Sequence, residues 1–365
     1  MGKGPAVSAY VLPVLGGLLA LTFFLWPDLS PAASGVLPGL LAVGSVALLC
    51  GSAFSAVGHA DVVEARLGQP WGTLVLTLSV TVIEVSVMAS MMLNGENNPT
   101  LARESVLSVL MIVNAGIVGL CLLLGSIRHR EQTIQQQGVS GYLSATIALG
   151  VMLLILPSET RAGASGIFSP FQLIYMSAIA LALYAAFLYM QTVRHREHFN
   201  AQPEGHAEAP PELPAFLRAV FMLLGSLGAV VALSGWVAIS FEDFLGHFAL
   251  RDPDAVTGAL VATLILLPEG LSAVRAAARN HLQHSLNIAL GSALATVSLT
   301  IPAMAFISVM IGRPMVLGLD NEDRTMLLLT FVLSVLSFGT GKTNALNGVV
   351  HLIVFCVYVM LLFAP

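Results

Sequence analysis

Long apolar runs recur along almost the whole chain, separated by short breaks rich in Gly, Pro, Asn and charge. A run of about 20 apolar residues, at 1.5 Å per residue in an α-helix, crosses the ~30 Å hydrocarbon core of a bilayer. About eleven such segments cover residues 8–26, 35–57, 72–93, 104–125, 140–157, 170–191, 216–238, 256–278, 285–311, 325–339 and 344–363. The pattern predicts an all-α polytopic membrane protein with about eleven transmembrane helices.

Composition agrees with a lipid environment. Of the 365 residues, 56% are hydrophobic and only 10% are charged, whereas soluble domains carry about 25% charged residues. Lys and Arg together number 15 and form no basic stripe, so no nucleic-acid partner is expected. The expected partners are the lipid bilayer and small ions. The sequence allows an oligomer but does not determine the oligomeric state.

One polar connection divides the chain. Residues 194–215 are rich in Pro, Glu and His and are predicted to form a cytoplasmic linker. Residues 1–33 hold one extra transmembrane helix, and ten segments remain as five before the linker (34–193) and five after it (216–365). A five-span unit repeated in tandem must be inverted in its second copy, as in many secondary transporters.

Basic residues predict the orientation. With the N-terminus in the cytoplasm, ten of the 15 Lys and Arg residues lie inside and five lie outside. This bias is the one that the positive-inside rule expects.

Two glutamates lie deep inside predicted spans. Gly72 and Gly258 each lie near the start of the second span of their half. Glu84 follows Gly72 by 12 residues, and Glu269 follows Gly258 by 11. Each carboxyl is therefore expected roughly 16–18 Å deep, near the middle of the bilayer. An ionised carboxylate there costs at least ~2.5–3.5 kcal/mol and marks an ion or proton pathway. A structural carboxyl would instead need an Arg or Lys at the same depth.

Small polar residues accompany both glutamates and can supply oxygen ligands. Pro268, next to Glu269, is expected to interrupt its helix and free carbonyl groups. Each hydroxyl has an alternative role, a hydrogen bond to the carbonyl four residues earlier on its own helix. The residues expected to line the site are Thr81, Asn114, Asn287, Ser292 and Thr296.

Other polar residues are expected to have simpler roles. Glu96, Arg103 and Glu104 are predicted to be solvated at the ends of spans, with Glu104 as the one that can line an access path. His351, on an apolar span, is expected to be packed or hydrogen-bonded and not a ligand. The His- and Glu-rich residues 195–206 are interpreted as a solvated loop, with a weak cation sensor as the alternative.

Several segments together resemble the cation/calcium exchanger superfamily, most closely its bacterial calcium/proton and sodium/proton antiporters. The likeness covers residues 55–61, 79–95, 268–302 and 341–348. The resemblance implies one extra helix plus two inverted five-helix repeats, and a location in the cell inner membrane. It implies that Glu84 and Glu269 bind the transported cation and the proton, lined by Asn114, Ser292 and Thr296. The family's asparagines before each acid are missing here, so the choice among Ca²⁺, Na⁺ and K⁺ stays open.

The predicted function is exchange of a cytoplasmic cation (Ca²⁺, Na⁺ or K⁺) for protons by alternating access, with no cofactor. A cation channel or uniporter that uses the same acidic pair is the main alternative. An intramembrane enzyme is less compatible, because the sequence contains no HExxH or GxSxG motif.

Overall fold

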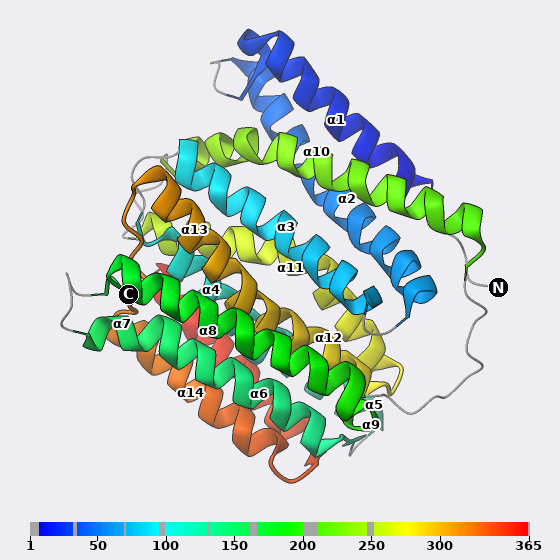
Figure 1. The fold of residues 1–365 in the computed structure, drawn as a ribbon, viewed down its shortest axis with the longest axis vertical. Helices are drawn as coiled ribbons and strands as arrows, with labels where there is room; N and C mark the ends of the chain where they lie inside the picture. Colours follow the sequence, from blue (N-terminus) through cyan, green and yellow to red (C-terminus); the bar gives the residue numbers. More distant parts are fainter. Residues whose placement is uncertain are drawn as a thin grey trace. The chain divides into compact units, whose positions relative to one another are not determined.

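The computed structural model describes residues 7–31, 35–68, 71–94, 99–129, 132–160, 166–199, 211–246 and 252–363. These residues are almost entirely helical (Figure 1). The chain forms two compact units, each assembled from separate stretches of sequence. Unit 1 comprises Met1–Asn98 and Ala207–Leu250, and unit 2 comprises Pro99–His206 and Arg251–Pro365.

The described residues of unit 1 form four long helices and one short 3-10 helix. The elements are α1 (Ser8–Leu25), η1 (Pro27–Leu29), α2 (Val36–Leu67), α3 (Trp71–Asn94) and α10 (Leu213–Gly246). Helix α10 packs along α2, α3 and α1, so a helix from after the linker completes the unit (Figure 1). Hydroxyl pairs join these helices, with Ser55 Oγ 3.0 Å from Ser226 Oγ and Ser90 Oγ 2.6 Å from Ser234 Oγ.

Unit 2 contains the remaining helices and one two-stranded antiparallel ladder. Its elements before the linker are α4 (Leu101–Met111), η2 (Ile112–Ile117), α5 (Val118–His129), β1 (Gln132–Thr133), α6 (Gln136–Gly150), η3 (Val151–Ile155), α7 (Leu156–Glu159), α8 (Pro170–Tyr189), η4 (Met190–Arg194) and α9 (Arg196–Phe199). Its elements after the linker are α11 (Pro253–Ala278), α12 (Leu282–Ala295), η5 (Thr296–Thr300), α13 (Ile301–Ile311), α14 (Asn321–Phe338), β2 (Lys342–Thr343) and α15 (Ala345–Phe363). Strand β1 pairs with β2 in the register Gln132↔Thr343 and Thr133↔Lys342.

The core of unit 2 is the continuous helical segment formed by α4, η2 and α5. Every residue of α4 is buried, and the segment packs against α11, α12, α14 and α15. Helices α6, α8 and α13 lie farther out, where α8 contacts both α6 and α13 (Figure 1).

The two glycines that aligned the predicted spans both permit close helix contacts. A Cβ atom at Gly72 would lie 2.8 Å from the Cα atom of Glu64 on α2. A Cβ atom at Gly258 would lie 2.8 Å from the backbone nitrogen of Ser105 on α4. Any larger side chain at either position would push the two helices apart.

Local signals explain where several helices begin. Helix α8 starts with a capping box, in which the Ser169 hydroxyl accepts from the Gln172 backbone N–H and the Gln172 side chain accepts from Ser169 N–H. Helix α11 starts at Pro253, after Asp252, whose carboxylate accepts from the Ala255 backbone N–H at 3.0 Å.

Four segments of the helices have π-helical hydrogen bonding, namely η2, η3, η4 and η5. Within the described residues, all four belong to unit 2. A π-helical turn contains an extra residue, which leaves a carbonyl group available to an outside donor, and such turns often mark functional sites.

In the described part of the chain, ten helices are long and apolar enough to cross a membrane. The all-α membrane fold is confirmed. The expected segment at 325–339 forms α14, which is not among these ten helices. The first turn of α14 carries Glu322, Asp323 and Arg324, and these charges lower its mean hydropathy. Helices α2 and α10 are longer than expected, with 32 and 34 residues. At 1.5 Å per residue they are about 48 and 51 Å long, which exceeds the thickness of a bilayer core.

The outer surfaces of both units are apolar. Phe24 of unit 1 is 78% exposed, and Phe306 and Leu336 of unit 2 are 68% and 70% exposed. Large apolar side chains in such number would be unfavourable in water, and lipid is the solvent that accommodates them.

The two units do not follow the predicted halves, because α10 joins unit 1 while most of the first half lies in unit 2. Compactness and sequence repetition are different properties, so the division into 34–193 and 216–365 stays a prediction. Of the predicted linker, residues 200–210 lie outside the described residues, while η4 and α9 precede that gap and α10 begins at Leu213.

Candidate functional site

Glu84 lies on α3 of unit 1, as predicted, and its side chain is buried, with 3% of its surface exposed. The predicted neighbour Thr81 donates its hydroxyl to the Thr77 carbonyl at 3.0 Å. Ser79 and Ser86 likewise donate to the carbonyls of Val75 and Val82 on the same helix. These hydroxyls therefore have the alternative role expected from the sequence, a hydrogen bond to the carbonyl four residues earlier on their own helix. A hydroxyl that donates in this way still has oxygen lone pairs with which to contact a cation.

Glu269 lies on α11 of unit 2, is half-buried, and accepts a hydrogen bond from Ser292 on α12. Here the predicted neighbour comes from a different helix, since α11 and α12 pack against each other. A hydroxyl that donates to a carboxylate stabilises its ionised form and holds it in one orientation.

The expected break of the helix at Pro268 is wrong. Helix α11 runs without interruption from Pro253 to Ala278 with Pro268 inside it. Neighbouring helices on both sides support the segment, because α11 packs against α4, α5 and α12. Departure from regular α-helix occurs instead in the partner helices, at η2 and η5.

Asn114 is 1% exposed and lies within η2, which packs against both α11 and α12. Its side-chain Nδ2 donates to the Leu110 carbonyl at 2.9 Å, which identifies the other amide atom as the oxygen. That oxygen, Oδ1, is buried and has no hydrogen-bond partner among the described residues. A buried amide oxygen without a donor is costly unless a ligand uses it.

His351 is completely buried on α15 and holds the same segment from the other side. Its Nδ1 lies 2.7 Å from the Asn114 carbonyl and its Nε2 lies 3.1 Å from Ser337 Oγ. Because a carbonyl only accepts, Nδ1 must carry the hydrogen, and Ser337 then donates to Nε2 in the neutral ring. The expectation of a hydrogen-bonded histidine is confirmed, and its partner is the backbone of a predicted site residue.

The other two predicted residues lie on the helix that carries Ser292. Thr296 is buried at the start of η5, one turn beyond Ser292 and on the same face. Asn287 lies five residues before Ser292, where its Nδ2 donates to the Phe199 carbonyl and its Oδ1 accepts from Gln283 Nε2 at 2.9 Å. The structure thus gives Asn287 a contact with α9, and its lining role stays a prediction.

Arg103 and Glu104 are not solvated, contrary to expectation. They are 7% and 3% exposed, and Arg103 Nε lies 2.7 Å from Glu104 Oε1. Arg103 also contacts Asp320 Oδ2 at 2.7 Å and the Gly318 carbonyl at 2.5 Å. The segment before α14 buries this pair, which no local feature of residues 101–106 indicates. Glu96 lies outside the described residues.

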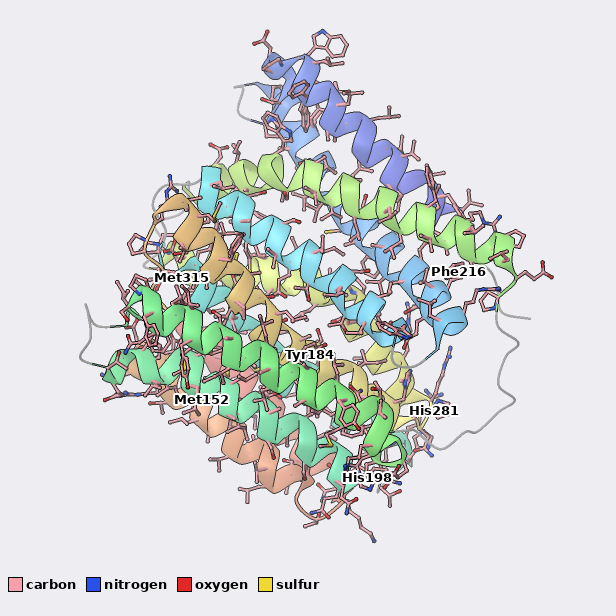
Figure 2. All side chains as sticks on the ribbon, in the orientation of Figure 1. Met152, Tyr184, His198, Phe216, His281 and Met315 are labelled. Atoms are coloured by element: carbon pink, nitrogen blue, oxygen red, sulfur yellow. The ribbon has the colours of Figure 1, made fainter. Side chains whose placement is uncertain are left out.

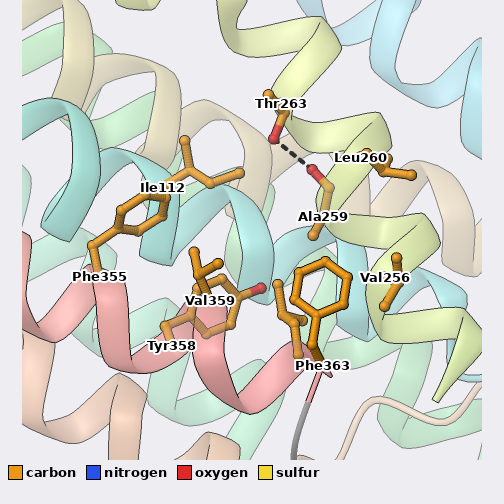
Figure 3. Close-up of a pocket in the computed structure, with 10 residues that line it drawn as sticks. Ile112, Val256, Ala259, Leu260, Thr263, Phe355, Tyr358, Val359 and Phe363 are labelled. Carbon is orange, nitrogen blue, oxygen red and sulfur yellow. Dashed lines mark hydrogen bonds between the residues drawn. The ribbon is translucent and has the colours of Figure 1, made fainter. Parts of the chain in front are cut away.

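An apolar pocket in unit 2 lies between α11, α15 and Ile112 (Figure 3). Its lining residues supply only two side-chain oxygens, the hydroxyls of Thr263 and Tyr358, and no carboxylate. Cations such as Na⁺ and Ca²⁺ need several oxygen ligands. The pocket is therefore not the candidate ion site.

Two π-helical segments were not predicted from the sequence. They are η2, which contains Asn114, and η5, which begins at Thr296. The only local signal is the run of small and polar residues at 114–116 and 296–300. Apolar periodicity does not detect one extra residue in a turn.

Comparison with known proteins identifies the family. The sequence profile described as sodium/calcium exchanger protein matches residues 37–193 and 218–364. The chain is 40% identical over 331 residues to the putative ionic transporter y4hA of Sinorhizobium fredii, covering 89% of each protein. It is 37% identical over 366 residues to the sodium-potassium/proton antiporter ChaA of Escherichia coli, covering 98% of this chain and 96% of that protein.

A solved structure has the same fold. The structure of native YfkE superposes with a TM-score of 0.70 at 16% sequence identity, covering 98% of this chain and 100% of the other. With the profile match over most of the chain and two relatives above 30% identity, the chain belongs to the sodium/calcium exchanger protein family and is a multi-pass membrane transporter, not an enzyme.

Proposed function

We propose that this transporter exchanges a cytoplasmic cation for protons by alternating access, with Glu84 and Glu269 as the shared cation and proton site. The observation that carries the proposal is the hydrogen bond from Ser292 to Glu269 inside unit 2. It joins a carboxylate predicted to bind the ion and a hydroxyl predicted to line the same site.

The oxygen atoms of this region suit hard cations. Glu269 supplies a carboxylate, Ser292 a hydroxyl and Asn114 a buried amide oxygen, and these are the ligand types that Ca²⁺ and Na⁺ take. A carboxylate binds a cation or a proton but not both, so protonation releases the cation. Competition at the two glutamates couples the flows of the two ions.

The proposed cargo includes Na⁺ and K⁺ as well as Ca²⁺. The relative from Escherichia coli is named a sodium-potassium/proton antiporter. The absence of asparagines before Glu84 and Glu269 also reduces the number of oxygen ligands, and Ca²⁺ takes six to eight oxygen ligands in all.

The proposed location is the cell inner membrane, with the N-terminus in the cytoplasm. The bias of Lys and Arg, ten inside against five outside, supports this orientation. Export of the cytoplasmic cation is then driven by protons that enter down their gradient.

Everted membrane vesicles test the function directly. Addition of Na⁺, K⁺ or Ca²⁺ to vesicles with an imposed pH gradient is expected to release protons in the wild type. The variants Glu84→Gln and Glu269→Gln are each expected to lose this response by at least about tenfold, since an amide neither ionises nor balances the cation charge. Glu159→Gln, which removes a carboxylate paired with Arg324 at the surface, is the matched control.

Two results would contradict the proposal. Cation-dependent proton release that persists in both glutamine variants would exclude the glutamate pair. Cation current that follows the membrane potential at equal pH on both sides would identify a channel or uniporter in place of an exchanger.

A further inference from the structure

Three side chains of metal-ligand type gather where η4 ends and α9 begins in unit 2. His195 Nδ1 lies 3.6 Å from Glu197 Oε1, and His198 Nε2 lies 3.7 Å from the same oxygen. All three ligand atoms lie within 4.8 Å of one another. His198 is labelled in Figure 2 at the end of the helical segment formed by α8 and η4.

The separations suit one small metal ion. Bonds of about 2.0–2.2 Å in a tetrahedral site place neighbouring ligand atoms roughly 3.3–3.6 Å apart. The two distances to Glu197, 3.6 and 3.7 Å, lie at or just above this range, and the two imidazole nitrogens, within 4.8 Å of each other, converge by side-chain rotation. The side chains of His195, Glu197 and His198 are 45%, 67% and 32% exposed, so an ion can enter from solvent and a water molecule can complete its coordination.

The imidazoles of His195 and His198 lie next to each other, and each is close to the Glu197 carboxylate. The two rings are stacked with centroids 5.2 Å apart and planes 5° from parallel. To bind one ion together, the rings must rotate out of this stack, because the lone pair of each imidazole nitrogen lies in the plane of its ring.

Helix α9 is firmly attached to the rest of unit 2. The ring of Phe199 packs edge-on against Tyr142 and Phe187, with centroids 5.5 and 5.6 Å apart. The Phe199 carbonyl accepts a hydrogen bond from Asn287 on α12, the helix whose Ser292 contacts Glu269. A change in the position of α9 therefore acts directly on the helix next to Glu269.

We propose that His195, Glu197 and His198 form a binding site for a divalent transition-metal ion of the Zn²⁺ type, and that its occupancy acts on α12 through Phe199 and Asn287. Two imidazole nitrogens and one carboxylate favour Zn²⁺, Co²⁺ or Ni²⁺. They disfavour Ca²⁺ and Na⁺, which take oxygen ligands, so the site is chemically distinct from that of the transported cation.

Binding is tested on the full chain in detergent, without a polyhistidine tag. Titration with Zn²⁺ by calorimetry, and with Co²⁺ by visible absorption, is expected to show one ion per chain with a tetrahedral spectrum. The double variant His195→Gln/His198→Gln is expected to bind at least about 100-fold more weakly, since even residues behind the ligands contribute 10- to 100-fold. The control is His281→Gln, an exposed histidine of the same unit that is labelled in Figure 2 and should bind as the wild type does.

Equal binding by the wild type and the double variant would overturn the site, as would no binding by the wild type. This arm does not involve transport, so it is independent of the proposed exchange function.

The link to α12 is tested in vesicles and rests on that function. Zn²⁺ is expected to change the rate of cation-dependent proton release at least about twofold in the wild type, a shift of roughly 0.4 kcal/mol in the barrier. The change should be absent in the double variant and in Asn287→Leu. A Zn²⁺ response of equal size in the double variant, or none in the wild type, would overturn the link.

Discussion

The two units hold their helices together with different kinds of polar contact. Unit 1 uses neutral hydroxyl pairs such as Ser90 with Ser234, in which either atom can donate. Unit 2 also has such a pair, Ser108 with Tyr358, but in addition it has contacts to charged groups, for example Ser292 with Glu269 and Arg103 with Asp320. The π-helical segments of the described chain also all lie in unit 2.

This difference bears on how the two glutamates are held. A hydroxyl pair can reverse its direction at little cost, so it holds helices close without fixing their exact position. A contact to a charged group in a dry interior is lost with a penalty when one partner moves. We therefore expect the geometry of cation binding to depend more on the neighbours of Glu269 than on the hydroxyls beside Glu84.

The largest expected effect is on stability, at the charged contact of unit 2. Arg103→Gln leaves the Glu104 carboxylate buried without its cation, which typically costs about 3–5 kcal/mol. Unfolding of the purified protein in detergent measures this loss. Arg324→Gln, at an exposed ion pair with Glu159, is the control and should cost about 0–1 kcal/mol.

Rescue gives a second check of the same contact. The double variant Arg103→Gln/Glu104→Gln should recover most of the lost stability, because the buried charge is gone. Equal destabilisation by Arg103→Gln and Arg324→Gln would show that the buried pair is not dry.

A smaller effect is expected on cation affinity, in a direct comparison of the two glutamates. Ser292→Ala removes a hydrogen bond to a carboxylate, worth about 1.5–3 kcal/mol, so the half-saturating cation concentration should rise at least about tenfold. Thr81→Val removes a hydroxyl that donates within its own helix and should raise it by less than about threefold. Proton release in vesicles at several cation concentrations measures both, and equal losses would contradict the proposed difference between the units.

The smallest effect is expected in the helix packing of unit 1. In a double-mutant cycle of Ser90→Ala and Ser234→Ala, the coupling in unfolding free energy should be about 0.6 kcal/mol, as for other interhelical hydrogen bonds in membranes. A coupling above about 2 kcal/mol would show that this hydroxyl pair is as position-specific as the contacts of unit 2.

Helix positions were largely predictable from the sequence. The expected segments 8–26 and 285–311 correspond to Ser8–Leu25 and Leu282–Ile311. The segment expected at 35–57 continues to Leu67, because a helix needs only its own backbone hydrogen bonds to pass polar residues. One of these, His59, is buried, with its Nε2 3.3 Å from the Ala9 carbonyl of α1.

The candidate site was predictable only in part. Glu269 was recognisable because a charged residue is unusual in an apolar helix, and Ser292 because it lies among small polar residues on the following span. The contact between His351 and Asn114 joins residues 237 positions apart, and the contact of Arg103 with Asp320 joins residues 217 apart. Neither pair has a signal in its own segment.

Membrane class, the approximate helices and the two intramembrane glutamates follow from local composition, because crossing a bilayer requires only a sufficient apolar length and makes every charge within it conspicuous. The partners of each polar group depended on which helices pack together. Packing placed Ser292 on Glu269, turned the hydroxyl of Thr81 back to its own helix, and buried Arg103 with Glu104. A side chain in a dry interior bonds whatever donor or acceptor lies within about 3 Å, and only the folded chain brings distant residues that close.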